Sequence, residues 1–310
     1  MNDSNNIGSI LLHYNSPNDL FNCINDLVSQ EGIKQKIIII DNNSMPDHVA
    51  SIKKWCFEHF PTALIGSYEV VENHIKQGNI RPKLSLVLHN QNNGYSAGNN
   101  LGFKLAKSLG CDAVLIANPD MRFPDARYIY SLYSVLKENT DNVIAASRII
   151  GLDDKQQSPL REASFYDEFF WFRNYLPSFF HSKPFILNVE GNTPIEVSKV
   201  MGCALLISTD YLAAIDYFDE GVFLFSEEAI LASKVQRDKK KIIFSPHLSA
   251  IHAHNKNEKG NGSLRMLLYI KSRLYYLENY SKYNTFQKWC LKFSYSVLKI
   301  MHIINSKRLT

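Results

Sequence analysis

The stretch of sequence at residues 84–120, LSLVLHNQNNGYSAGNNLGFKLAKSLGCDAVLIANPD, decides the fold class. It contains two short apolar runs, Leu84–His89 and Ala113–Ala117, each of a length typical of a buried strand. Between them lie a polar, glycine-bearing loop over residues 90–100 and a segment over 101–108 with helical spacing. A strand, a helix and a second strand in this order indicate part of a mostly parallel sheet.

The same alternation extends toward the N-terminus. Residues 7–13 and 36–40 are apolar runs that predict two further strands, and residues 18–30 and 49–60 carry apolar side chains at helical spacing. No internal repeat or low-complexity segment interrupts the pattern. The sequence therefore predicts an α/β fold in which helices cover both faces of a mostly parallel central sheet.

Polar clusters follow four successive predicted strands. They are Tyr14-Asn15, Asp41-Asn42-Asn43, the loop over 90–100 and Asn118-Pro119-Asp120. Ligands bind such sheets at the carboxyl ends of the strands, so these clusters predict one shared binding site. The alternative is that the loops are polar only because they are exposed to water. A loop at the opposite edge of the sheet, 31–35, is nevertheless unremarkable in composition.

The second half of the chain has a less regular pattern. Residues 151–193 are rich in aromatic side chains, which fit an acceptor-side insertion, an oligomer contact or ordinary core. A strand-like segment with small residues follows at 197–208, and an apolar run at 241–244 predicts a late strand. A helical pattern begins directly after the adjacent acids Glu227 and Glu228.

Carboxylate and imidazole side chains stand at the ends of several of these segments. Asp120 follows a buried strand and can hold a hard divalent cation that binds phosphate oxygens, although Pro-Asp at a strand end is usually a turn. Glu227 and Glu228 precede a helix, where acids commonly complement the helix dipole. His252 and His254 share one face of an extended segment, and each can be either a metal ligand or a loop histidine with a structural hydrogen bond.

Composition and charge exclude several classes of function. Hydrophobic residues make up 45% of the 310 residues and charged residues 21%, which is enough for a sizeable core. The formal net charge of +4 is too small to indicate a nucleic-acid-binding protein. Five scattered cysteines without a CxxC pair indicate reduced thiols. The polar N-terminus predicts no signal peptide, and no apolar run reaches about 18 residues, so a cytoplasmic protein is expected.

The last part of the chain differs from the rest in charge. Residues 281–310 hold six basic residues and no acid, whereas the remainder has a net charge of −2. On a helical projection, one sector of about 120° contains large apolar side chains, and a stripe of lysines lies beside it. The apolar side chains are Trp289, Phe293, Val297, Ile300, Met301 and Ile304. This pattern predicts either a helix on an anionic membrane surface or a terminal helix docked on the protein. Leu291 and Leu298 lie on the far side and weaken the first interpretation.

The order of these features resembles the inverting glycosyltransferases of family 2, which have the GT-A fold. It is similar in particular to the bacterial branch that includes rhamnosyltransferases of surface-polysaccharide assembly. The resemblance covers about residues 7–280 and is weakest over 151–197. Its most specific parts are the NNGYSAGNN stretch at 92–100, Asn118-Pro119-Asp120 and the segment over 218–228.

The resemblance implies a role for each matching residue. Asp41 would bind the pyrimidine ring of the donor nucleotide, and Asp120 would hold a metal ion together with His252, or with His254 as the alternative. Glu228, or else Glu227, would be the general base. The remaining nucleotide-sugar contacts would come from the strand ends, the glycine loop and a C-terminal helix: Tyr14, Asn15, Asn43, Asn93, Gly94, Ser96, Gly98, Asn99, Asn118 and Arg273.

The activity implied by the resemblance is transfer of a sugar, with rhamnose as the first candidate, from a dTDP- or UDP-linked donor. The acceptor would be a hydroxyl of a glycan or of a polyprenyl-diphosphate-linked sugar in bacterial surface-polysaccharide synthesis, as for O-antigen or capsule. Mg²⁺ or Mn²⁺ would neutralise the diphosphate as a Lewis acid, and in-line attack would invert the anomeric centre. The implied organisation is a GT-A domain over 1–262, with 151–197 as a variable acceptor-side insertion. A C-terminal helical region over 263–310 would follow and would hold the enzyme on the inner face of the membrane if it binds lipid.

Two positions depart from the family pattern. Asn118 stands where the family often has the first Asp of an Asp-x-Asp motif, and Glu228 is one methylene longer than the family's catalytic Asp. These departures keep a second hypothesis open, an inactive relative that serves as a binding or scaffold subunit of a polysaccharide assembly complex. A dehydrogenase is disfavoured because no GxGxxG follows the first strand, and a nucleotidyltransferase because residues 14–19 offer no glycine-rich basic loop.

Overall fold

The computed structural model describes residues 5–78, 81–176, 184–253 and 262–307. A mixed sheet forms its centre, in the strand order β3-β4-β2-β1-β5-β10-β7-β11-β6, with β8 beside β7 and β9 beside β11. The strands are β1 (Asn6–His13), β2 (Lys34–Asn42), β3 (Leu64–Gly66), β4 (Leu84–His89), β5 (Ala113–Ala117), β6 (Met121–Arg122), β7 (Asn142–Gly151), β8 (Gln156–Ser158), β9 (Ile195–Val197), β10 (Ala204–Ser208) and β11 (Lys241–His252). The helices are α1 (Pro17–Val28), α2 (Pro46–His59), α3 (Tyr68–Lys76), α4 (Tyr95–Ser108), α5 (Tyr128–Lys137), α6 (Phe165–Phe169), the 3₁₀ helix η1 (Trp171–Tyr175), α7 (Thr209–Ala214), α8 (Glu227–Arg237), α9 (Gly262–Asn279) and α10 (Thr285–Lys307).

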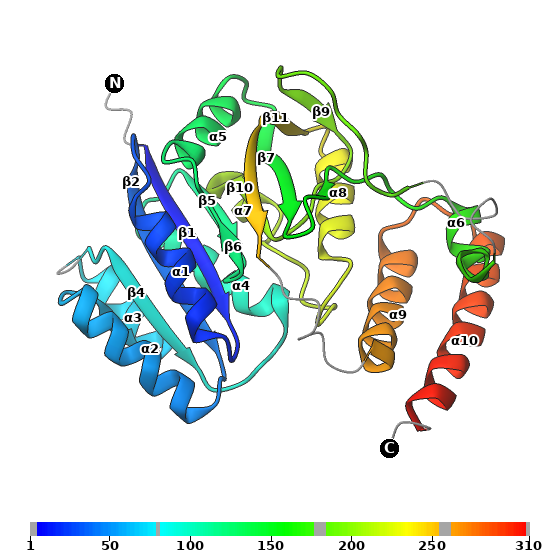
Figure 1. Ribbon diagram of the computed structural model, residues 1–310, viewed down its shortest axis with the longest axis horizontal. Coiled ribbons are helices and arrows are strands. Elements are labelled where there is room, and N and C mark those ends of the chain that lie inside the picture. Colours follow the sequence, from blue (N-terminus) through cyan, green and yellow to red (C-terminus); the bar gives the residue numbers. More distant parts are fainter. Residues whose placement is uncertain (1–4, 79–80, 177–183, 254–261, 308–310) are drawn as a thin grey trace.

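Helices cover both faces of this sheet, as the alternation of strands and helices predicts (Figure 1). The apolar side chains of α1, α2 and α5 pack on one face and those of α3, α4, α7 and α8 on the other. Strand β2 reads IIII at its centre and is buried on both sides, which is typical of a strand inside a parallel sheet.

The four strands predicted in the first 120 residues all form, and they are mutually parallel. β1 pairs with β2 and with β5, and β2 pairs with β4. Their carboxyl ends therefore lie at one edge of the sheet, where the polar clusters follow them. Helix α4 begins at Tyr95, earlier than the expected start at residue 101. Gly94, with φ of 96°, ends the loop, and the Tyr95 N–H then donates to the Phe223 carbonyl oxygen.

The second half of the sheet contains one reversed strand. β10 is antiparallel to both β5 and β7, and β11 is parallel to β7, so the ends of β5, β7 and β11 point the same way. β11 is much longer than the expected 241–244, because its pairing with β7 resumes after an irregularity between Ser245 and Ser249. This extension carries His252 to the strand end where the site is located.

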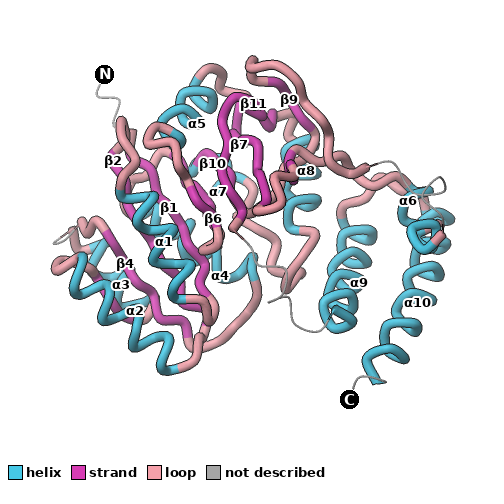
Figure 2. The backbone as a smooth tube through the Cα atoms, in the orientation of Figure 1, coloured by secondary structure: helices cyan, strands magenta, loops and turns pink. Residues whose placement is uncertain are grey.

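The C-terminal helices pack into a cluster of their own. α9 and α10 lie beside one another at the edge of the molecule, away from α2 and α3, with α6 against α10 (Figure 2). The cluster is held by apolar side chains such as Ile270, Leu277 and Leu291 and is continuous with α8 through Ile230. Among the described helices, none is both long enough and apolar enough to cross a membrane.

Candidate active site

A cavity of about 1210 Å³ lies where β5, β7 and β11 end. Its wall includes the acidic and imidazole groups of Asp120, Glu227, Glu228 and His252. Other parts of the wall come from the region over 151–197 and from α9 and α10. One cavity thus brings together Asp120, His252 and the two candidate bases with Asn118 and Arg273, whereas the clusters at Tyr14-Asn15 and Asp41, which were predicted to share the site, do not line it.

Asp120 and His252 are brought together by the pairing of two distant strands. β6 pairs antiparallel with the end of β11, so that His252 lies opposite Met121, and the Ala253 N–H donates to the Asp120 carbonyl oxygen. Asp120 Oδ2 lies 3.2 Å from His252 Nε2. His252 Nδ1 lies 2.8 Å from Gln157 Oε1, and this contact orients the ring with Nε2 toward Asp120.

This pair has the chemistry of a divalent-metal site. A carboxylate oxygen and an imidazole nitrogen are both ligands of Mn²⁺, and a hydrogen bond to the far ring nitrogen is the usual support of a ligating histidine. In the described part of the chain no three His, Cys, Asp or Glu side chains gather as a metal site. His254, the alternative ligand, lies outside the described residues.

Glu227 and Glu228 open helix α8 but have different surroundings. The turn before them is left-handed at Phe225 and Ser226, with φ of 72° and 67°, a strained conformation for side chains of this kind. Glu228 Oε1 accepts the Gly202 N–H at 3.2 Å, and a Cβ at Gly202 would come within 3.2 Å of Glu228 Oε1. Glu227 is half-buried with a buried Oε2 atom, and this burial together with the negative charge of Glu228 raises its pKa well above the usual value.

Tyr95 belongs to this site although the sequence analysis did not single it out. Its hydroxyl donates to the Gly202 carbonyl oxygen at 2.9 Å and lies 3.3 Å from Asn118 Oδ1. It thereby connects the end of β5 to the Gly202 turn that holds Glu228. Burial, followed by the charges of Glu227 and Glu228, raises its pKa. The available signal was an aromatic residue in an otherwise polar loop.

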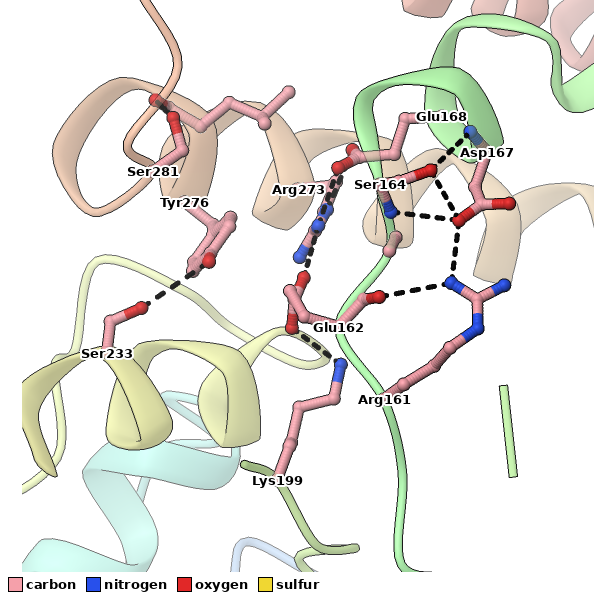
Figure 3. Close-up of polar contacts among 12 residues, drawn as sticks. Arg161, Glu162, Ser164, Asp167, Glu168, Lys199, Ser233, Arg273, Tyr276 and Ser281 are labelled. Carbon is pink, nitrogen blue, oxygen red and sulfur yellow. Dashed lines mark hydrogen bonds and ion pairs between the residues drawn. The ribbon is translucent and has the colours of Figure 1, made fainter. Parts of the chain in front are cut away.

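Arg273, on α9, lines the cavity, but its guanidinium forms ion pairs with Glu162 and Glu168 of the region over 151–197 (Figure 3). Its Nη2 lies 2.7 Å from Glu168 Oε1 and 2.5 Å from Glu162 Oε1, and its Nε lies 2.9 Å from Glu168 Oε2. Glu162 also binds Lys199 at 2.7 Å. Arg273 therefore holds the insertion and the C-terminal helices together at the cavity wall.

Asp41 lies at the end of β2, outside the lining of this cavity. It is 2% exposed, and its Oδ1 accepts from His13 Nδ1 at 3.0 Å while its Oδ2 accepts the Ser44 N–H. His13 Nε2 accepts the Ser16 N–H, which places the ring proton on Nδ1. Burial raises the pKa of Asp41, but the hydrogen bonds from His13 and Ser44 outweigh it and lower the pKa. His13 was missed because a histidine inside an apolar run looks like a strand residue.

The other predicted nucleotide contacts also lie outside the cavity wall. Asn15 Oδ1 accepts the Met45 N–H, and Tyr14 is 55% exposed beside it. In α4, Gly98 packs on Leu12, whose side chain a Cβ would approach to 2.3 Å. Ser96 and Asn99 are buried in the first turns of α4. Asn43 and Asn93 are exposed at turns, and Gly94 is buried and tightly packed directly before α4. Their roles in donor binding stay predictions.

No protein-family model matches the chain. The chain is 23% identical over 248 residues to a curated protein, the low-salt glycan biosynthesis hexosyltransferase Agl10 of Haloferax volcanii. The aligned region covers 78% of this chain and 66% of that protein, so the chain spans just under two thirds of the length of this relative.

Solved structures with the same arrangement are also glycosyltransferases. A mannosyltransferase of Pyrobaculum calidifontis, in complex with GDP-mannose and Mn²⁺, matches 92% of this chain and 68% of its own, with a TM-score of 0.57 and 13% identity. GalNAc-T7, with UDP, GalNAc and Mn²⁺, matches 95% and 55%, with a TM-score of 0.57 and 11% identity. The predicted fold is confirmed: the chain has the GT-A fold.

Proposed function

We propose that the protein is an inverting glycosyltransferase that moves a sugar from a nucleotide-diphosphate donor to an acceptor hydroxyl. The observation that carries this proposal is the cavity whose wall holds both the Asp120–His252 pair and the Glu227–Glu228 pair. The similarity to a hexosyltransferase and to two nucleotide-sugar enzymes with Mn²⁺ supports glycosyl transfer. An inactive scaffold subunit, the competing hypothesis, has no need of such a collection of charged groups.

The two glutamates receive different roles in the proposal. Neighbouring carboxyl groups resist simultaneous ionisation, and burial together with the charge of Glu228 raises the pKa of Glu227, which favours its neutral form. Glu228, held by the Gly202 N–H, is then the carboxylate that accepts the proton of the acceptor hydroxyl. Direct attack on the anomeric carbon from the side opposite the departing diphosphate inverts that carbon.

Asp120 and His252 are the proposed holders of the metal ion. When bound, the ion supplies Lewis-acid neutralisation of the charge that develops on the diphosphate. The imidazole favours Mn²⁺ over Mg²⁺, since Mg²⁺ in proteins is bound almost wholly by oxygen. Asn118, whose amide oxygen is near the Tyr95 hydroxyl, would shape the site as a neutral group.

The proposed substrates rest on the family resemblance, the similar structures and the lining of the cavity. For the donor we propose a dTDP- or UDP-linked hexose, with rhamnose first, and GDP-mannose as the main alternative from the structural neighbour. For the acceptor we propose a hydroxyl of a glycan or polyprenyl-diphosphate-linked sugar in bacterial polysaccharide synthesis. The apolar side chains of Trp171, Met266 and Leu298 in the cavity wall suit such an acceptor. They belong to the 151–197 insertion and to the proposed helical region over 263–310.

The test is release of nucleoside diphosphate from a panel of nucleotide-sugars by the purified full chain with Mn²⁺. We expect turnover with one donor class, its loss with EDTA and its return with added Mn²⁺. Glu228→Gln should lower turnover by about 10²–10⁴-fold while donor binding stays nearly intact. Glu227→Gln is the matched control and should stay within about threefold of wild type, because the raised pKa of Glu227 disfavours the ionised form that a general base needs.

Two outcomes would contradict this proposal. A Glu228→Gln variant within about threefold of wild type would remove Glu228 from the role of base. Absence of donor turnover with every nucleotide-sugar, in the presence of donor binding, would favour the scaffold hypothesis.

A further inference from the structure

Helix α10 presents apolar side chains on two opposite faces. The inner face packs on α9 and carries Leu291, Tyr295 and Leu298, which are 0–5% exposed. The outer face carries a second apolar row, named here the outer stripe, whose members are 46–71% exposed: Phe286, Trp289, Phe293, Val297, Ile300 and Ile304. Leu291 and Leu298 are therefore the side chains through which α10 packs on the rest of the protein. The outer stripe takes no part in this packing.

The outer stripe is continuous along the helix. At about 100° per residue its members fall within about 80° of the helix circumference, opposite the inner face. From Phe286 to Ile304 it extends for about 27 Å at about 1.5 Å per residue. The rings of Phe286, Trp289 and Phe293 stack along it. A continuous exposed apolar surface of this size marks an interaction site.

The charges around the outer stripe are positive. Lys288, Lys292 and Lys299 lie along one edge of it, and the sequence over 281–310 contains no acid. Glu278 on α9 pairs with Lys292 at 2.8 Å in an exposed ion pair. Such a pair is weak in water, so the edge of the stripe keeps a net positive charge.

We propose that the outer stripe docks on a phospholipid bilayer that contains anionic lipid, with α10 lying in the plane of the interface. Tryptophan and phenylalanine insert among the acyl chains near the headgroups, and lysines beside them bind the anionic surface. A second copy of the chain is a poorer occupant, because a symmetric contact through the stripe would bring two lysine rows of like charge together. Docking needs no donor, metal or turnover, so its test is independent of the proposed reaction.

The first experiment is flotation of the full chain with vesicles. The two vesicle types are pure phosphatidylcholine and phosphatidylcholine with about 30% phosphatidylglycerol, at about 50 mM and about 500 mM salt. We expect the protein to float with the anionic vesicles, and to do so less at high salt and with the neutral vesicles. Recovery of the wild-type chain in the soluble fraction with anionic vesicles would overturn the proposal.

The matched variants test whether vesicle binding depends on the outer stripe or on exposed apolar side chains in general. The double variant Trp289→Glu/Phe293→Glu should lower vesicle affinity at least tenfold. Phe57→Glu, at a 60% exposed position on α2 far from the stripe, should leave it unchanged. Equal flotation of the double variant and wild type would overturn the proposal. So would a wild-type dimer in sedimentation velocity that the double variant converts to monomer, because a second copy would then cover the stripe.

A fluorescence measurement on the wild-type chain does not depend on whether the variants fold. Lipids brominated in the acyl chains should quench tryptophan emission, since Trp289 is 65% exposed whereas Trp55 and Trp171 are partly buried. Trp289→Phe should abolish most of this quenching and still float. Flotation without quenching would show binding by headgroup charge alone and would overturn the interfacial position of the helix.

Discussion

The Oε2 atom of Glu227 is buried and makes no hydrogen bond among the described residues, while the neighbouring Glu228 accepts one from Gly202. The carboxyl groups are chemically identical and adjacent in sequence. Burial and the negative charge of Glu228 raise the pKa of Glu227, which favours the neutral form of that carboxyl group. Environments that differ between paired acids are a common basis for assigning their roles.

The raised pKa of Glu227 predicts a pH-dependent stability. The folded protein keeps a proton on Glu227 that the unfolded chain releases above the usual pKa of 4.5, so the free energy of unfolding falls as pH rises toward the folded pKa. Glu227→Gln lacks this proton and should gain about 2–4 °C in melting temperature at pH 8, with less gain at pH 5. Thermal melts from pH 5 to pH 8 provide the measurement. Glu58→Gln, at an exposed position, is the control, and equal gains for Glu227→Gln at all pH values would contradict the argument.

Gly94 is a second residue where local geometry predicts a defined effect. Its φ is 96°, and a Cβ there would come within 2.3 Å of the Phe223 carbonyl oxygen. Gly78 has a similar φ of 72° but open space around it, so Gly78→Ala reports only the conformational cost of about 1–2 kcal/mol. Gly94→Ala should destabilise the protein clearly more than Gly78→Ala in urea denaturation. Equal losses of stability in the two variants would mean that the backbone at Phe223 moves away from the new Cβ without a cost in free energy.

At the scale of elements, one buried arginine joins α6 to α9. Arg273 and Glu168 are 4% and 4% exposed, and the Tyr295 hydroxyl of α10 also donates to Glu168 at 2.8 Å. Removing one member of such a buried group leaves an uncompensated charge, which is much more damaging than loss of an exposed pair. The contacts that shape this part of the cavity wall therefore depend on the full set.

Arg273→Met should lower the free energy of unfolding by about 3–5 kcal/mol. The matched control is Lys292→Met, which breaks the exposed pair between α10 and Glu278 of α9 and should change stability by less than about 1 kcal/mol. The double variant Glu168→Gln/Arg273→Met should recover part of the loss, because both buried charges are then gone. Chemical denaturation measures all three, and a loss below about 1 kcal/mol for Arg273→Met would refute the assignment.

At the scale of the whole molecule, the site is assembled from distant parts of one sheet. Asp120 follows β5 and His252 ends β11, 132 residues later in the chain. Mn²⁺ and a nucleoside diphosphate should therefore stabilise the entire folded chain. At 100 times the dissociation constant the linkage is worth about 2.7 kcal/mol.

Thermal melts with Mn²⁺ and UDP should show this stabilisation as a rise of several degrees. Asp120→Asn and His252→Ala should each lose the Mn²⁺-dependent part of the rise. His247→Ala, an exposed histidine on the same strand as His252, should keep it. An undiminished Mn²⁺ effect in both site variants would place the metal elsewhere.

The sequence by itself determined the local elements and their order. Periodicity in the apolar residues located β1, β2, β4 and β5 and the helices between them, and the parallel direction of these strands followed from that alternation. It also located the polar clusters at the strand ends, because those depend only on where each strand stops. The start of α4 at Tyr95 was missed, since a contact with Phe223 fixes it.

The tertiary structure alone decided which side chains meet. The pairing of β6 with β11 places Asp120 against His252, and the packing of α8 buries Glu227 while Gly202 holds Glu228. It also places Asp41 against His13 rather than in the cavity and engages Arg273 with Glu168. A sequence pattern reports the spacing of neighbours along one element, whereas burial and ion pairing depend on long-range register and packing, which no local spacing encodes.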